Sequence, residues 1–530
     1  MLAHRAAPRN AHPGGFGCND TGVPPARLAG TIARMRVALA TSSTIAADGG
    51  RAVARQGGNA VDAAIAAALV SMNTEPGVCA LAGGGYVTVW PPGTAPLTYD
   101  GYVTVPGAGA SLRPADGRVE TVGMAYGGGV TTLIGPGSVA VPGALAALDH
   151  AWSDHGSVPW GALLAPGVRA AAEGFPLPRA CHYYLGYSGE AIFSLAADSR
   201  TALYRPDGRL REPGERIVVP HLARSLTRIA ERGAAEFYTG EIGAAIADHV
   251  RGRGGTLTRD DLAGCCAVRR AALTVDVGDW QLATNPAPAI GGAVLVAMLE
   301  RLRAFAGVDA AALLRVCREV LGYRRDRLDF SRDLDADVAE LLARAQSGGL
   351  SRSAATVHTS AVDEHGLACA ITMSSGYGSG EMAPGTGLWL NNCLGEIDLN
   401  RRGLEVGPPG TRLLSNMAPS AARSGDAMLA IGSPGASRIT TALLQTLVNF
   451  IHHRMPLERA IDAPRLHVEY DGDDERIAYE AGVDAGALGN AHRYDERNMY
   501  FGGVGAALRD AAGDFAVAAD NRREGGTFIA

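Results

Sequence analysis

The chain has 530 residues, of which 47% are hydrophobic and 19% charged, and its formal net charge is -6 at pH 7. A chain of this length exceeds one ordinary domain and predicts two lobes or one large two-layer body with a sizeable core. The acidic balance, with no basic stripe interleaved with aromatic residues, argues against nucleic acid as a partner. All basic residues other than His are Arg, which excludes a Lys nucleophile and a P-loop Lys.

The N-terminal segment, residues 1–36, mixes Arg, Pro, Gly and Asn without an apolar stretch, so we expect it to be loosely ordered and not a secretory signal. No apolar run in the sequence is long enough to cross a bilayer. The eight Cys are scattered, without a CxxC pair or a His at zinc-finger spacing. We therefore expect a cytoplasmic protein without membrane contact, buried thiols, no disulfide framework and no structural zinc.

Helical periodicity dominates the first two thirds of the chain. A long Ala-rich helix is expected over 45–72, with an interruption at 57–59, and a glycine bend at 83–85 feeds a strand that ends at Trp90. Thr258 looks like the N-cap of a short turn. The Arg- and Asp-rich stretch 311–345 predicts a solvated helix pair rather than a binding surface. Further helices are expected over 145–155, 163–173, 222–232 and 240–250.

Strands dominate the last third, and Thr356 stands at the head of the first one. The expected strands cover 359–362, 368–373, 387–391 and 428–431. A flexible segment, 347–353, precedes Thr356 and offers a reachable backbone for cleavage. If the chain is cut before Thr356, the new α-amine lies beside the hydroxyl that it can activate. Thr is also a common strand residue, so its position alone is equally compatible with a structural role.

A glycine turn at 432–438 separates the last of these strands from a helical run at 439–452. Such a turn leaves backbone N–H groups directed at one spot, which suits an anion or an oxyanion. The alternative is a tight connection with only a structural role. No Gly-Lys-Ser/Thr follows it, so it is not a Walker loop.

With these residues in place, the chain resembles the γ-glutamyltranspeptidase family of N-terminal nucleophile hydrolases from about residue 38 to 528. The resemblance includes Gly-Gly-Asn-Ala-Val-Asp-Ala-Ala at 57–64, Thr-Val-His at 356–358 and Gly-Ser-Pro-Gly at 432–435. The other shared motifs are at 75–76, 83–85, 137–143, 235–240, 254–255, 260–262, 390–392, 463–465, 502–504 and 519–520.

The resemblance implies an α+β fold, a four-layer αββα sandwich, made as a precursor that cleaves itself. The bond would be Ala355-Thr356, giving a large subunit, 37–355, and a small subunit, 356–530, that stay associated. Thr356 would be the nucleophile and its α-amine the base, with no cofactor and no metal. The second hydroxyl of the family, which orients the nucleophile, falls on Ser374, and the oxyanion amides fall on Gly435 and Ala436.

The resemblance weakens at the residues that grip a γ-glutamyl group. Tyr102 or its neighbour stands where the family has an Arg that pairs with the substrate α-carboxylate, a bidentate clamp that has no replacement here. Glu396 takes the place of an Asp that receives the α-amino group, Ser415 and Asn416 replace a Ser-Ser pair, and the family's Asn after the second hydroxyl is missing. The catalytic parts are kept while the glutamyl-specific parts are altered.

The leading hypothesis is an autoprocessed Thr hydrolase that acts on a small acyl substrate other than an ordinary γ-glutamyl compound. It could cleave an amide or, as in the antibiotic-pathway relatives, a carbon-carbon bond, and the processed heterodimer could pair into a homodimer. A true γ-glutamyl transpeptidase or glutathione hydrolase, in which Arg412 or another Arg holds the carboxylate, is the first alternative. A catalytically silent scaffold that stays uncleaved is the second.

Several other polar residues have structural interpretations that we prefer. His358 is expected to be packed rather than metal-bound, because no second ligand stands at suitable spacing. The acidic run 471–475 lacks the remaining EF-hand positions and predicts a solvated turn. Cys393 either touches substrate or is an inert buried thiol, and Asn391 and Asn392 either bind substrate or brace a turn.

Overall fold

The computed structural model describes residues 35–109, 113–125, 129–345, 356–397, 399–471, 474–484, 488 and 491–530. The chain divides into residues 1–31 and residues 32–530, and the fold described below belongs to the second unit. The segment 347–353, Ala355 and all but the last two residues of the N-terminal segment 1–36 lie outside the described residues.

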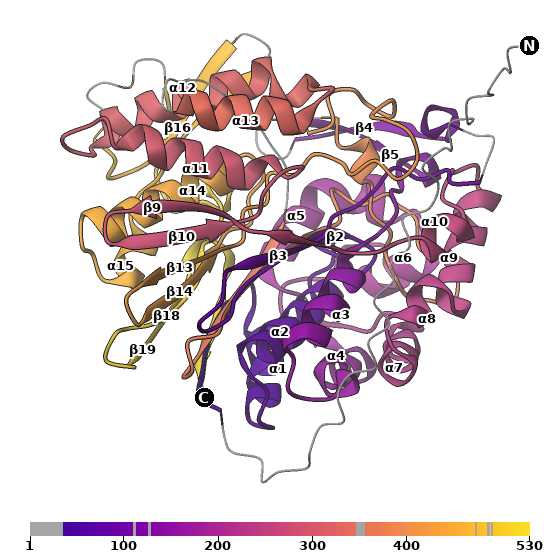
Figure 1. The fold of residues 1–530 in the computed structure, drawn as a ribbon. Helices are drawn as coiled ribbons and strands as arrows, with labels where there is room; N and C mark the ends of the chain where they lie inside the picture. Colours follow the sequence, from indigo (N-terminus) through magenta and orange to yellow (C-terminus); the bar gives the residue numbers. More distant parts are fainter. Residues whose placement is uncertain are drawn as a thin grey trace, which may run out of the picture. The chain divides into compact units, whose positions relative to one another are not determined.

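Two antiparallel sheets form the centre of the fold (Figure 1). The first has the order β20-β1-β11-β12-β2-β3-β8 and the second the order β19-β18-β14-β13-β10-β9. The strands of the first sheet are β1 (Val37–Thr41), β2 (Gly84–Trp90), β3 (Leu97–Gly101), β8 (Val268–Ala271), β11 (Val357–Asp363), β12 (Ala368–Ser374) and β20 (Gly526–Ile529). Those of the second are β9 (Leu273–Val277), β10 (Trp280–Thr284), β13 (Ser420–Ser424), β14 (Ala427–Gly432), β18 (Gly505–Arg509) and β19 (Phe515–Ala519).

Small side chains fill the space between the two sheets. Ala38, Ala370 and Val362 of the first sheet form one buried cluster with Ala283 and Ala430 of the second. Two sheets that pack face to face must interdigitate their inner side chains, and Ala lets the backbones approach closely. The Ala-rich composition of these strands therefore allows the two sheets to pack closely face to face.

Helices cover the outer face of each sheet (Figure 1). The helices α1 (Thr44–Ala54), α2 (Ala60–Thr74), α3 (Ala144–His155) and α4 (Trp160–Glu173) belong to the layer on the first sheet, and α11 (Ile290–Leu302) and α14 (Arg438–Leu447) pack on the second. The four-layer αββα sandwich predicted from the sequence is confirmed.

The remaining elements surround these layers. The helices are α5 (Arg179–Ser188), α6 (Ala197–Leu203), α7 (Leu222–Arg232), α8 (Ala235–Tyr238), α9 (Glu241–Gly252), α10 (Arg259–Ala263), α12 (Ala310–Asp326), α13 (Leu334–Ala345) and α15 (Leu457–Asp462). The minor sheets contain β4 (Glu120–Met124), β5 (Val130–Ile134), β6 (Phe175–Pro176), β7 (Arg216–Ile217), β15 (Leu466–Asp471), β16 (Asp474–Glu480) and β17 (Ala491–Tyr494). No helix among the described residues is both long and apolar enough to span a membrane.

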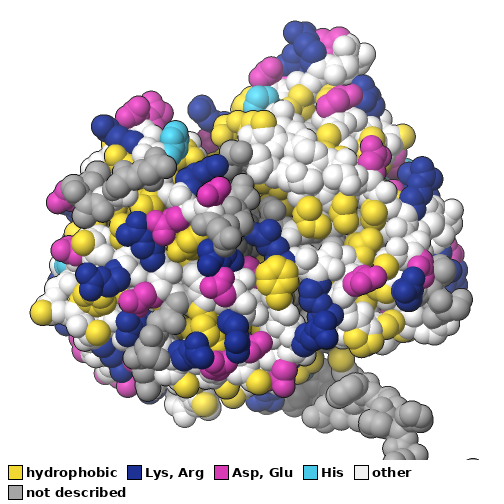
Figure 2. Space-filling model, turned by 90° about the horizontal axis from the view of Figure 1, so that it is seen from above, with side chains coloured by type: hydrophobic (Ala, Val, Ile, Leu, Met, Phe, Trp, Pro, Cys, Tyr) yellow, Lys and Arg dark blue, Asp and Glu magenta, His cyan; other side chains and the backbone are white. Residues whose placement is uncertain are grey.

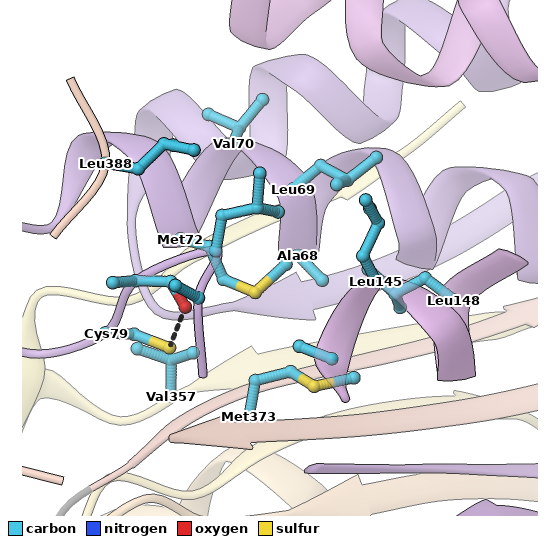
Figure 3. Close-up of a cluster of buried hydrophobic side chains, with 14 of the residues drawn as sticks. Ala68, Leu69, Val70, Met72, Cys79, Leu145, Leu148, Val357, Met373 and Leu388 are labelled. Atoms are coloured by element: carbon cyan, nitrogen blue, oxygen red, sulfur yellow. Dashed lines mark hydrogen bonds between the residues drawn. The ribbon is translucent and has the colours of Figure 1, made fainter. Parts of the chain in front are cut away.

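Helix α2 packs against β11 and β12 of the first sheet. Asn59 caps it, and its side chain accepts from the amides of Val61 and Asp62 in a capping box. All fifteen residues of α2 are buried, so the helix is apolar all round and lies inside the fold. Figure 3 shows Met72 of α2 in the same buried cluster as Val357 of β11 and Met373 of β12.

Most predicted elements are confirmed, including the interruption of the first long helix, which becomes α1 and α2. The strand predicted over 387–391 is wrong: Trp389 and Leu390 make only isolated bridges, to Met382 and Ala82. Instead of a continuous strand ladder, the Asn391 side chain makes hydrogen bonds there, donating to the backbone carbonyls of Ala82 and Ala140. The acidic run 471–475 lies at the β15–β16 hairpin, whose residues 472 and 473 are outside the described residues.

The stretch 311–345 forms the predicted helix pair, α12 and α13. One part of it is not solvated, because Arg324 and Asp329 form an ion pair of 3.0 Å with both side chains 1% exposed. The seven Cys in the described part of the chain are free thiols, and five of them are buried.

Candidate active site

Thr356 immediately precedes β11, and its side chain is buried, with 2% exposure. The β11–β12 ladder pairs Val357 with Met373. One further step in the same register places Thr356 opposite Ser374, the last residue of β12. Directly opposed residues of an antiparallel pair have Cβ atoms about 4.5–5.5 Å apart. The hairpin therefore brings the two predicted hydroxyls together, and the Ser374 Oγ also accepts from the Gly376 amide at 3.1 Å.

The glycine turn after β14 approaches the same end of β11 from the facing sheet. Met428, near the start of β14, lies against Gly366, beyond the far end of β11. Gly432, at the end of β14, packs directly on the His358 ring, since an added Cβ there would lie 2.2 Å from it. Strand β14 therefore runs antiparallel to β11, and the turn that follows Gly432 continues toward Thr356.

Gly435 and Ala436, in this turn, have unusual backbone angles. Their φ values are +124° and +67°, and an added Cβ on Gly435 would lie 2.6 Å from the Gly502 Cα. Ala436 occupies the left-handed region that a residue with a Cβ rarely adopts, and such strain tends to occur at functional sites. The amides of Gly435 and Ala436 donate to no acceptor among the described residues. Two unpaired N–H groups just before helix α14 suit an oxyanion.

His358 is held as a neutral, structural residue. Its Nδ1 lies 2.8 Å from the Thr372 hydroxyl and its Nε2 2.7 Å from the Ser360 hydroxyl. Complete burial lowers its pKa to about 3. Both ring nitrogens are engaged and the ring is uncharged at neutral pH, so the preference for a packed His is confirmed. No group of His, Cys, Asp and Glu suited to a metal occurs within the described ranges.

Tyr102 is fully enclosed rather than open to a pocket. Its exposure is 1%, and its ring stacks on Tyr86 with the centroids 5.8 Å apart. Burial, with Cys393 and Glu396 beside the hydroxyl, raises its pKa well above the ordinary value for Tyr. Burial and the neighbouring Glu396 raise the pKa of the Cys393 thiol in the same way. The two groups stay neutral, and Cys393 has the properties of an inert thiol.

Glu396 lies close to the hairpin that carries Ser374. An ideal Cβ on Gly376 would be 3.0 Å from the Glu396 Oε2 and 2.3 Å from the Asn392 Oδ1, so only a glycine fits there. Asn392 accepts from the Tyr377 amide at 2.7 Å, and Asn391 donates to Ala82 O at 2.8 Å. Asn392 braces this turn, whereas Asn391 joins its own segment to the backbones of Ala82 and Ala140, and Glu396 lies beside the turn.

Ser415 and Asn416 are buried at the N-terminus of α11. The Ser415 carbonyl accepts from the amides of Ile290 and Gly291 at 2.9 and 3.0 Å, and its hydroxyl accepts from Met417 N at 3.3 Å. The Ser415 hydroxyl also lies beside the Tyr86 hydroxyl. Ser415 thus links the stacked Tyr86–Tyr102 pair to the second sheet.

Asp100 is the residue of this region that the sequence did not reveal. Its fully buried carboxylate accepts from Arg270 Nε at 2.9 Å and from the Tyr102 amide at 3.1 Å, and it pairs with Arg412 at 3.4 Å. Arg412 also donates to the carbonyls of Tyr102 and Cys266. A single Asp within a strand gives no sequence signal, because the three segments that meet on it are distant in the chain.

Two stacked antiparallel sheets between layers of helices form the fold of the N-terminal nucleophile hydrolases. The sequence profile of the gamma-glutamyltranspeptidase family matches residues 46–321 and 318–530, and the chain belongs to that family. Members of this family are hydrolases or acyltransferases that typically have a Thr nucleophile, and this protein is an enzyme of that kind.

Comparison with individual proteins adds two kinds of relative. The chain is 28% identical to the glutathione hydrolase proenzyme of Escherichia coli over 486 residues, which cover 83% of this chain and 81% of that protein. It is 27% identical to the acylase ACY 1 proenzyme of Pseudomonas sp. over 545 residues, covering 92% of each. The structure of a cephalosporin acylase from Bacillus halodurans has the same fold, with a TM-score of 0.75 at 23% identity, over 97% of this chain and 99% of that one.

Proposed function

We propose that this protein is an autoprocessed threonine hydrolase that acts on a small acyl substrate with a pocket not built for γ-glutamyl groups. The observation that carries the proposal is the convergence of Thr356, Ser374 and the unpaired amides of Gly435 and Ala436 at one end of the two sheets. These are the groups that acyl transfer needs.

The reaction follows from the roles of these groups. After cleavage of the Ala355-Thr356 bond, the free α-amine of Thr356 accepts the proton of the Thr356 hydroxyl as Oγ attacks the substrate carbonyl. The amides of Gly435 and Ala436 stabilise the resulting oxyanion. The ammonium then returns the proton to the leaving group, and water releases the acyl group from Oγ by the same steps. Ser374 orients the Thr356 hydroxyl by a hydrogen bond.

The sheet topology supports lasting association of the two subunits. In the first sheet, β11 of the small subunit lies between β1 of the large subunit and β12, and β12 in turn pairs with β2 of the large subunit. Separation would break these two ladders and also the β1–β20 ladder and the β10–β13 ladder of the second sheet. A cut at Ala355-Thr356 therefore leaves the fold intact.

The free thiols of the described residues support a reducing, cytoplasmic location.

The pocket supports a substrate other than a γ-glutamyl compound. The position of the family's Arg is occupied by Tyr102, whose neutral ring is buried against Tyr86. Arg412, the alternative carboxylate ligand, is already engaged by Asp100 and by two backbone carbonyls. Holding a substrate carboxylate would require Arg412 to leave these partners, and Asp100 would keep a buried charge. The bond that is hydrolysed is an amide or, in the form of this proposal that involves secondary metabolism, a carbon-carbon bond.

A panel of chromogenic anilides tests the proposal. We expect turnover of a neutral or oxalyl-type acyl anilide and little turnover of the γ-glutamyl anilide, with Thr356→Ala losing activity by at least about a thousandfold. The exposed Thr201, on α6, provides a matched control, and Thr201→Ala should retain the full rate. An unchanged rate in Thr356→Ala would contradict the assignment. Efficient turnover of the γ-glutamyl anilide would instead establish the glutathione-hydrolase alternative, and an uncleaved chain without activity would establish the silent scaffold.

A further inference from the structure

A cleft of about 360 Å³ lies between the segment 400–414, the connection that leads into α13, and β8. Its size is in the range of small-molecule sites. It lies next to the candidate active site: Asn400, in its wall, donates to Cys393 O at 2.6 Å, and Leu414 directly precedes Ser415. Figure 2 shows the face that carries α12 and α13, where basic and acidic side chains are intermixed.

Four arginines line this cleft, and they fall into two pairs. Arg270 and Arg412 share the buried carboxylate of Asp100, which balances one of their two charges and holds both side chains in place. Arg332 and Arg402 are exposed and make no ion pair with any residue of the described ranges. The second pair therefore supplies the positive charge that is available to a ligand.

The acidic groups in the wall limit how much negative charge the cleft can accept. Asp329 is paired with the buried Arg324, while Asp335 adds a carboxylate at the first turn of α13. Asp335 offsets one of the two charges of Arg332 and Arg402, so these exposed groups leave one net positive charge. A single carboxylate balances that charge, whereas a dianion such as a phosphate exceeds it.

The rest of the lining is apolar. Pro288, Leu334, Val406, Leu413 and Leu414 form the hydrocarbon part of the wall. A ligand that complements the whole cleft therefore has an apolar body and one anionic end. Asn400 adds a polar group to this wall: its Nδ2 is bonded to Cys393, while its buried Oδ1 has no partner in the protein among the described residues.

We propose that this cleft binds a small monocarboxylate with an apolar body, whose carboxylate is held by Arg332 and Arg402. The inference rests on the lining of the cleft and does not depend on the catalytic role of Thr356. The guanidinium pair recognises the carboxylate by charge-assisted hydrogen bonds, and the Leu and Pro side chains cover the hydrocarbon part.

Isothermal titration of the purified protein with phenylacetate tests the proposal, with phenylacetamide as the neutral analogue and phenyl phosphate as the dianion. We expect saturable one-to-one binding of phenylacetate, at least about tenfold weaker binding of both analogues, and a similar loss in the double variant Arg332→Gln, Arg402→Gln. Arg209→Gln is the matched control, because Arg209 is 73% exposed, pairs with Asp207 and takes no part in this cleft.

Several results would overturn the inference. Absence of saturable heat with phenylacetate, or equal affinity in the double variant, would show that the cleft is not a carboxylate site. Tighter binding of phenyl phosphate would mark a phosphate site instead. Because the two arginines are exposed and form no ion pair with a described residue, the double variant should fold normally, which its circular dichroism spectrum and melting temperature would verify. Retained binding in an inactive Thr356→Ala protein would separate this inference from the proposed catalysis.

Discussion

The buried imidazole of His358 makes folding stability depend on pH in a defined direction. Burial lowers its pKa to about 3 in the folded protein, while an unfolded His titrates near about 6.5. As pH falls below the unfolded value, the unfolded state binds a proton that the folded state does not. The free energy of unfolding is therefore highest above that pH and falls as the pH approaches 3. Between pH 7 and pH 5 the loss from this one residue is about 2 kcal/mol.

Urea unfolding at these two pH values, at a fixed protein concentration, measures this loss. His358→Gln keeps hydrogen bonds to the hydroxyls of Thr372 and Ser360 but cannot titrate. We expect the difference in unfolding free energy between pH 7 and pH 5 to shrink by about 2 kcal/mol in this variant, whatever its absolute stability. His453→Gln, at an exposed position, is the matched control and should keep the wild-type difference. The same pH dependence in His358→Gln and wild type would refute a buried neutral His358.

Three further substitutions test the site and its support. Ser374→Ala should lower kcat by about 10- to 100-fold with little change in KM, as measured by steady-state kinetics. The Thr356 hydroxyl would lose the group that orients it, while the contacts that bind the substrate would stay the same. Gly435→Ala should destabilise the fold by about 1–3 kcal/mol and lower kcat, because its Cβ would meet Gly502 and its φ is +124°. Asp329→Asn should cost about 3–5 kcal/mol in urea unfolding, because it leaves the buried Arg324 charge without its partner.

Each of these substitutions has a matched control. Ser374→Thr keeps the hydroxyl and should restore most of the rate. Ala436→Gly removes strain at φ +67° and should change stability by less than about 1 kcal/mol. Asp207→Asn breaks an exposed pair with Arg209 and should also cost less than about 1 kcal/mol. A rate in Ser374→Ala equal to that of the wild type, or equal stabilities of Asp329→Asn and Asp207→Asn, would contradict the structural reasoning.

The β11–β12 hairpin could be predicted because its signals are local. Alternating strands on either side of a short turn fix the β11–β12 register, which places Ser374 opposite Thr356. The interruption of the first long helix could also be predicted from local sequence, because Asn59 and Asp62 form a capping box within four residues. The turn at Gly435 was recognised from its glycines and its place between a strand and a helix.

The pocket could not be predicted because its contacts join distant segments. The sequence indicated that Tyr102 replaces an Arg, but only the structure shows it buried on Tyr86. Asp100, which gathers Arg270 and Arg412, has no local signal at all. The strand expected at 387–391 failed for a related reason: its β pattern is local, but no neighbouring strand offers it a continuous edge, and only isolated bridges form.

Intact masses of the purified wild type and Thr356→Ala, measured under denaturing conditions, test the central claim most directly. The account predicts two fragments that meet at Ala355-Thr356 in the wild type and one uncut chain in the variant. A single uncut chain in both proteins would contradict autoprocessing at Thr356 and would favour the silent scaffold.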